Sequence, residues 1–109
     1  MSGAEDPVAQ VQRYLRGQNL EQLGRIDDAI AEYESAVAAG FDSTGPYDRL
    51  IALYAHRAEH SLVLRVVADA LANVRTAEDK RDWYRKMGAA AERASASIPK
   101  AAAKPRSNA

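Results

Sequence analysis

Apolar side chains recur along most of this chain at the three- and four-residue spacing of amphipathic helices. The pattern is clearest over residues 26–38, where four acidic residues occupy the face opposite the apolar one. The apolar positions of that face are Ile26, Ala29, Ile30, Tyr33, Ala36 and Val37. The helix before it has a weaker apolar stripe, which comprises Val8, Val11, Leu15, Leu20 and Leu23. Because helical periodicity continues to about residue 96, we predict an all-α fold.

Turn residues divide this pattern into helices. Gly24 separates the first two helices, Gly40 is placed to end the second in the left-handed conformation, and Pro46 suits the first turn of the third. We predict one hairpin at about 7–40, a second at about 44–73 and a single helix at about 76–96. We expect a disordered leader at 1–6 and a disordered basic tail at 97–109, where there is little to bury.

The chain is also similar to itself after a shift of 34 residues, when residues 10–43 are aligned with residues 44–77. A period of this length is typical of stacked helical hairpins, which present a concave surface and usually bind rather than catalyse. The matched pairs are Leu20 with Tyr54, Gly24 with Ala58, Ala29 with Val63, Ile30 with Leu64, Ala36 with Ala70 and Val37 with Leu71.

Composition narrows the class of protein. The 109 residues allow one domain, and 47% of them are hydrophobic, which suffices for one core. No cysteine is present, so disulfides, thiolate zinc sites and cysteine nucleophiles are excluded. The first residues do not resemble a secretory signal, and no apolar run approaches the roughly 18 residues of a membrane span. A cytoplasmic protein is therefore expected.

Charge is distributed unevenly although the net charge is zero. Residues 1–43 carry three basic and eight acidic side chains, whereas residues 78–109 carry eight basic and four acidic ones. Solvated helix faces explain this asymmetry. Head-to-tail self-association and an anionic partner at the C-terminal end are the alternatives.

Segment 17–41 resembles a tetratricopeptide repeat (TPR) of the kind found in short bacterial proteins. The family's small, aromatic and turn positions fall on Gly17, Leu20, Gly24, Ala29, Tyr33 and Ala36. The second repeat fits less well, because Ile51 and Val63 replace small residues and Val67 replaces an aromatic one. The resemblance covers about residues 10–96. It implies a right-handed α-solenoid of two hairpins closed by a capping helix.

In this family the first helix of each hairpin lines a concave groove. The resemblance places in that groove Tyr14, Gln18, Gln22, Arg49, Ala52, His56, Trp83 and Lys86. The lysine and asparagines with which some members clamp a C-terminal carboxylate are replaced here, so no such clamp is expected. Arg49 is free to pair with an acidic side chain of a partner, or it is salt-bridged to Asp48 or Glu21. Trp83 either packs the capping helix against the core or is a partly exposed binding anchor.

No constellation points to catalysis. His56 and His60 have the spacing of helical metal ligands, but the repeat places a turn between them, so neither a metal nor another cofactor is expected. Nucleic-acid binding by the basic C-terminal helix and tail is disfavoured, because acidic residues interleave with the cations. We therefore expect a non-catalytic adaptor or scaffold that binds another protein or peptide segment, with no membrane partner. A self-associating structural protein, such as a homodimer, is the alternative, and a nucleic-acid accessory protein is the weaker one.

Overall fold

The computed structural model describes the backbone of residues 7–75 and 77–108 and the side chains of residues 7–75 and 77–96. Within that backbone the regular elements are five helices, and no strand occurs there. They are α1 (Pro7–Gln22), α2 (Ile26–Ala38), α3 (Gly45–His56), α4 (His60–Asn73) and α5 (Glu78–Asn108). The prediction of an all-α fold is confirmed. The expected leader, 1–6, lies outside the described residues.

The last helix differs most from its predicted bounds. The backbone of α5 runs from Glu78 to Asn108, whereas the sequence predicts an end near residue 96. Alanine, which has the highest helix propensity, is the commonest residue between 89 and 103, and this favours continuation of the helix. The described side chains end at Ala96, and the disordered basic tail at 97–109 stays a prediction.

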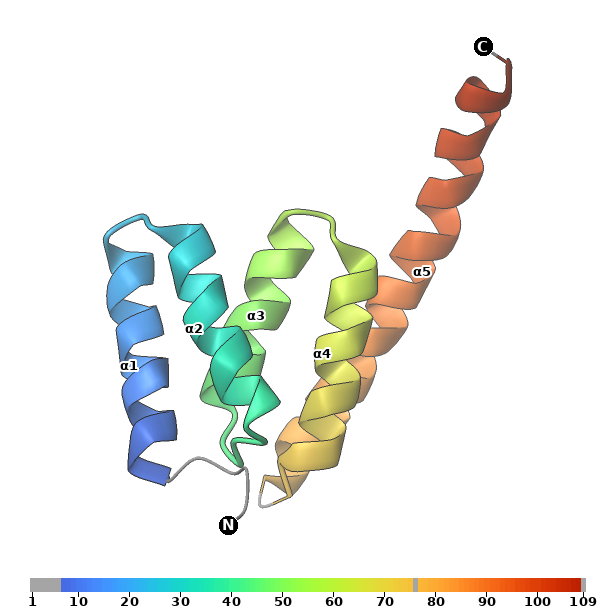
Figure 1. The fold of residues 1–109 in the computed structure, drawn as a ribbon. Helices are drawn as coiled ribbons and strands as arrows, with labels where there is room; N and C mark the ends of the chain where they lie inside the picture. Colours follow the sequence, from blue (N-terminus) through green and yellow to red (C-terminus); the bar gives the residue numbers. More distant parts are fainter. Residues whose placement is uncertain (1–6, 76, 109) are drawn as a thin grey trace.

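Each helix packs against its neighbours in the sequence, with α1 and α2 forming one antiparallel pair and α3 and α4 another (Figure 1). The 34-residue period recurs in the bounds of these helices. The first helix of each pair ends at Gln22 or His56, and the second begins at Ile26 or His60. The two hairpin turns therefore recur at the same interval as the sequence.

The two hairpin turns close in the same way. Gly24 and Ala58 both have a left-handed backbone, with φ of 78° and 56°. The N–H of the residue that follows each of them donates to a carbonyl one turn back in the helix, Leu20 in the first hairpin and Tyr54 in the second, at 2.9 Å in both cases. This six-to-one hydrogen bond is the Schellman closure of a helix. Glycine adopts the left-handed conformation without strain, whereas alanine at the second turn does not.

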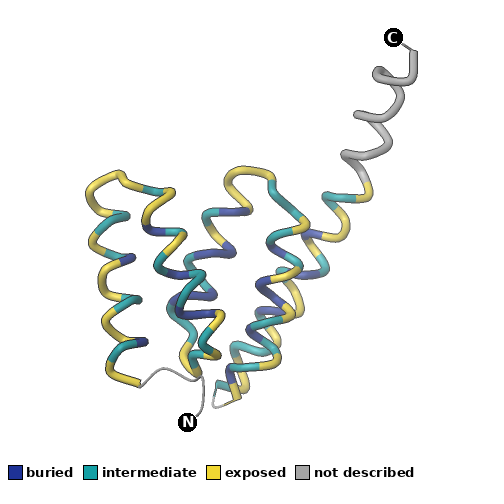
Figure 2. The backbone as a smooth tube through the Cα atoms, viewed as in Figure 1, coloured by how far each residue is buried: buried dark blue, intermediate teal, exposed yellow. Residues whose placement is uncertain are grey.

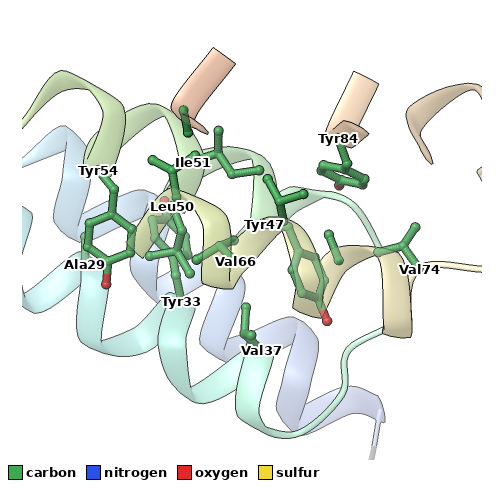
Figure 3. Packing of buried hydrophobic residues seen from close by; sticks show 14 residues of the cluster. Ala29, Tyr33, Val37, Tyr47, Leu50, Ile51, Tyr54, Val66, Val74 and Tyr84 are labelled. Carbon is green, nitrogen blue, oxygen red and sulfur yellow. The ribbon is translucent and has the colours of Figure 1, made fainter. Parts of the chain in front are cut away.

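The core lies between the two hairpins and beneath α5 (Figure 2). Its largest side chains come from four different helices and interdigitate (Figure 3). Tyr33 contributes from α2, Tyr47, Leu50 and Ile51 from α3, Val66 from α4, and Tyr84 from α5. A core rich in tyrosine has a chemical requirement, because a buried hydroxyl needs a hydrogen-bond acceptor.

Every core tyrosine meets that requirement. The Tyr33 hydroxyl donates to Glu21 at 2.8 Å, that of Tyr47 to the Phe41 carbonyl at 2.7 Å, that of Tyr84 to Asp48 at 2.9 Å, and that of Tyr54 to Glu34. Burial, reinforced by the accepting carboxylates, raises the pKa of Tyr33, Tyr54 and Tyr84. These hydroxyls therefore remain protonated donors at neutral pH, and three of them tie a surface carboxylate to the core.

The orientation of α1 is the main departure from the sequence pattern. Its apolar stripe would ordinarily face the core, but Val8, Val11 and Leu15 are exposed, as is Leu23 just after the helix. The face of α1 that meets α2 instead carries the buried Gln10 and Gly17. The reason is steric, because the ring of Tyr33 occupies the space directly above Gly17 and leaves room for no larger side chain there.

The N-terminal part of α5 shows a second departure. The helical spacing of Trp83 with Met87 and Ala90 predicts that Trp83 lies on the apolar face with Tyr84 beside it, whereas the structure buries Tyr84 fully and Trp83 only partly. The hydroxyl of Tyr84 reaches Asp48 on α3, which favours this rotation of the helix. Trp83 packs at the edge of the core against the ring of Tyr84, with ring centroids 5.3 Å apart.

Candidate functional site

Three of the expected groove residues meet at one hollow between α1 and α3. Gln18, Gln22 and Arg49 line it together with Glu21, and its volume is about 240 Å³. Its chemistry is polar, with two side-chain amides beside a charged pair. We call this feature the polar hollow.

The charged pair in the polar hollow joins the two hairpins. The Arg49 guanidinium donates through Nε to Oε1 of Glu21 at 2.9 Å and through Nη2 to Oε2, which makes the contact bidentate. The Arg49 hydrogen bond, together with the Tyr33 hydroxyl, holds the pKa of Glu21 below its usual value although burial opposes the shift. Of the alternatives that the sequence leaves open for Arg49, the salt bridge to Glu21 is therefore the one that forms.

Tyr14 has a more structural position than the groove assignment implies. Its ring packs against the ring of Tyr33, with centroids 6.0 Å apart, and it also covers the backbone of Gly45 at the start of α3. The Tyr14 hydroxyl accepts a hydrogen bond from Gln18 Nε2 at 3.0 Å. Tyr14 therefore fixes the orientation of an amide in the polar hollow.

The remaining groove residues do not line this hollow. Ala52 and His56 lie further along α3 and are exposed. Lys86 is exposed on α5, and Trp83 is partly buried, with the Lys80 ammonium 3.8 Å from its ring centroid in a cation–π contact. The structure thus unites the predicted residues of α1 with Arg49 and leaves those of α5 apart from them.

A second hollow, which sequence reasoning missed, lies where α3, α4 and α5 meet. Its volume is about 210 Å³, and we call it the apolar hollow. It is lined by Ala55, His60, Val63, Met87, Ala90, Ala91 and Ala94. The sequence feature that could have predicted this hollow is the cluster of alanines on α5, because small side chains at helical spacing leave room beside a neighbouring helix.

Of the five cations of α5 whose side chains the structure describes, three are engaged within the protein. Lys80 Nζ lies 2.9 Å from Asp48, and Arg85 lies 2.8 Å from Asp82. Arg81 donates to the carbonyls of Leu71 and Val74 at 2.7 and 3.0 Å, where it caps the end of α4. Few of the described cations on this helix therefore remain for phosphate groups.

The described part of the chain offers neither a metal site nor a membrane-spanning helix. Among the residues that the structure describes, no three His, Asp or Glu side chains are grouped so that they could hold a metal ion. His56 ends α3 and His60 begins α4, so a turn separates them. Over the same part of the chain, no helix combines the length and apolar character needed to cross a bilayer.

No protein-family model, curated protein or solved structure matches this chain.

Proposed function

We propose that this chain is a non-catalytic interaction module of the tetratricopeptide type, which holds a segment of a partner polypeptide across α1, α3 and α5. The repeated helix bounds and the repeated hairpin closures support this assignment, because they follow the 34-residue period of that family. A right-handed α-solenoid of two hairpins with α5 as its cap is part of the proposal. The partner class is a polypeptide, and the module acts as an adaptor or scaffold.

The observation that carries the proposal is the presence of two hollows of different chemistry that share α3. Arg49 lines the polar hollow and Ala55 the apolar one. These residues are six positions apart, which is roughly 9 Å along a helix axis. An extended peptide covers that distance in about three residues. The site therefore suits a short extended segment with a polar residue near one end and an apolar one near the other.

The charge state of the polar hollow refines this specificity. Arg49 is already neutralised by Glu21, so an acidic side chain of the partner gains little there. The amides of Gln18 and Gln22 can both donate and accept, which suits the backbone of an extended peptide. Peptide-backbone recognition is thus favoured over capture of a carboxylate.

Affinity capture from lysate of the native host, read by mass spectrometry, tests this function. The informative variant is Ala52→Glu, because Ala52 is exposed on α3 between the two hollows and a larger charged side chain there obstructs a bound segment. The matched control is Ala68→Glu, an equal change at an exposed alanine of α4. A polypeptide retained by the wild type and by the Ala68 variant, but lost by the Ala52 variant, supports the proposal.

Two further variants distinguish the contributions of the two hollows to binding. Gln18→Ala combined with Gln22→Ala removes the amides without adding bulk, and Met87→Ala enlarges the apolar hollow. Both changes are expected to weaken the binding of a captured partner. If all variants recover the same proteins as the wild type, the surface formed by α1, α3 and α5 is not the binding site.

A further inference from the structure

The outward face of α1 is the most hydrophobic part of the described surface. Its large side chains are Val8, Val11 and Leu15, with Leu23 directly after the helix, and they are 63%, 43%, 53% and 65% exposed. In the described part of the chain, no other large hydrophobic residues are exposed to this degree. This stripe lies opposite the face that packs on α2. The largest apolar patch on a domain is often an interaction site.

The shape of this face suits another helix. Gln12, Leu15, Arg16 and Asn19 line a shallow hollow of about 330 Å³ along α1. Helices associate by placing the side-chain ridge of one into the groove of the other. The stripe extends over 16 positions, which is roughly 22 Å, and so matches a partner helix of about the same length as α1.

The stripe and its border carry little charge. The polar residues beside it, Gln12, Asn19 and Gln22, are uncharged, and Arg16 donates to Glu32 on α2 at 3.3 Å. Charged residues make up 28% of the chain, so this depletion is specific to the face. Low charge is typical of the centre of a protein interface. It also suits self-pairing, because a two-fold axis brings identical groups together and would oppose like charges.

Leu15 lies near the middle of the stripe. Val8 lies seven positions before it, and Gln22 and Leu23 lie seven and eight positions after it. An antiparallel copy of the same helix with the two Leu15 side chains together therefore brings Val8 of one chain to the end of α1 that carries Gln22 and Leu23 in the other, and it sets Val11 near Asn19. We propose that this face of α1 binds the same face of a second copy of the chain, forming an antiparallel two-fold dimer with Leu15 beside the axis.

The area of the stripe limits the expected strength of the dimer. Four partly exposed side chains provide an apolar patch of roughly 300–400 Å². Two such patches with their polar borders bury about 1,000 Å², the lower limit for a specific interface. A weak, concentration-dependent dimer is therefore expected. This dimer requires no partner polypeptide, and it does not depend on the proposed groove.

Sedimentation equilibrium over a concentration series tests the dimer. The average mass of the wild type should rise towards that of two chains within the micromolar range. Leu15→Lys places two cations at the axis beside Arg16 and should weaken dimerisation at least about tenfold. Ala68→Lys, the matched change on α4, should leave it unaltered. A wild type that remains monomeric at millimolar concentration overturns the proposal, as does an equal loss in both variants.

Single-cysteine variants test the geometry, because the chain has no cysteine of its own. A disulfide needs Cα atoms less than about 7 Å apart, so oxidised Leu15→Cys should link to itself. Val8→Cys should not, because the two copies of that position lie roughly 20 Å apart along the helices. Mixed Val8→Cys and Leu23→Cys chains should form a heterodimer, and Ala68→Cys should remain monomeric. Efficient self-linking of Val8→Cys, or none by Leu15→Cys, refutes the antiparallel arrangement about Leu15.

Discussion

Replacing Gly17 by alanine should destabilise the protein even though alanine is the better helix former. A Cβ atom at this position would lie 2.5, 2.7 and 3.0 Å from Cε1, Cδ1 and Cζ of Tyr33. Carbon atoms in favourable contact are about 3.5–4.0 Å apart, so the ring would have to retreat by roughly 1 Å. Tyr33 is fully buried, and its hydroxyl is bonded to Glu21, which leaves it little freedom to move.

Two opposing effects determine the size of this change. Overpacking a close-packed core costs about 1–3 kcal/mol. Alanine recovers about 1 kcal/mol over glycine within a helix. The free energy of unfolding of Gly17→Ala should therefore fall by up to about 2 kcal/mol. In a domain of this size, the thermal midpoint should fall by up to roughly 10 °C.

Urea denaturation followed by far-ultraviolet circular dichroism measures this loss. Gly88→Ala is the control, because Gly88 is also buried in a helix but its added Cβ would meet only Val67, with Cγ1 at 3.2 Å. In that variant helix propensity should compensate for the contact and leave stability within about 0.5 kcal/mol of the wild type. A Gly17 variant as stable as the Gly88 variant would show that the Tyr33 ring is not held in place.

Three further outcomes follow from the turns and the buried polar groups. Because the backbone is left-handed at both Ala58 and Gly24, Ala58→Gly should stabilise the protein by about 0.5–1 kcal/mol and Gly24→Ala should destabilise it by about 1 kcal/mol. If urea denaturation shows stability changes of the same sign in both variants, this explanation is wrong. Because the Arg49 guanidinium lowers the pKa of Glu21, this carboxylate contributes stability above its ordinary pKa of 4.5, which is lost as the pH falls through the lower folded value. The difference in urea midpoint between the wild type and Glu21→Gln should therefore be constant above about pH 5 and shrink in acid, and a pH-independent difference would refute the linkage. Tyr84→Phe should lower stability by at least about 1 kcal/mol through loss of a buried hydrogen bond, and an unchanged urea midpoint would show that this bond contributes nothing.

The features that the sequence predicts well are local ones. Gly24 and Gly40 end their helices in the left-handed conformation, as turn chemistry requires. The self-similarity of the chain correctly places the second hairpin turn at Ala58, where no glycine marks it. Hairpin closures are set within a few residues, so one sequence suffices to predict them, whereas the end of α5 at Asn108 lies well beyond its predicted bound.

The orientation of a helix is a different problem, because it depends on what the neighbouring helix presents. Periodicity identifies the stripe through Val8, Val11 and Leu15 but does not say which side of α1 approaches α2. The contact that determines the orientation of α1 is between Gly17 on α1 and Tyr33 on α2. It places a glycine, and not the leucines of the stripe, against the core. Periodicity thus identifies an apolar stripe, and only packing shows whether that stripe faces the core of the chain.

The candidate site depends still more on distant contacts. Glu21 and Arg49 lie 28 positions apart, and the sequence could offer only competing partners for this arginine. Once the pair forms, it links the polar hollow to the core, because the same carboxylate accepts a hydrogen bond from the buried Tyr33 hydroxyl. Any displacement of Tyr33 should therefore be transmitted to the polar hollow, so packing of the first hairpin and geometry of the site are coupled.

The two proposed surfaces of α1 have a joint consequence. Gln18 and Glu21 face the polar hollow, whereas Leu15 lies on the outward stripe, and Gln22 lies between these faces. An antiparallel dimer would therefore bring two polar hollows to either side of its axis. A partner that carries two copies of its binding segment could occupy both, and linkage then requires that it strengthen the dimer. An interface too small for permanent association would in this way allow the bound partner to control assembly.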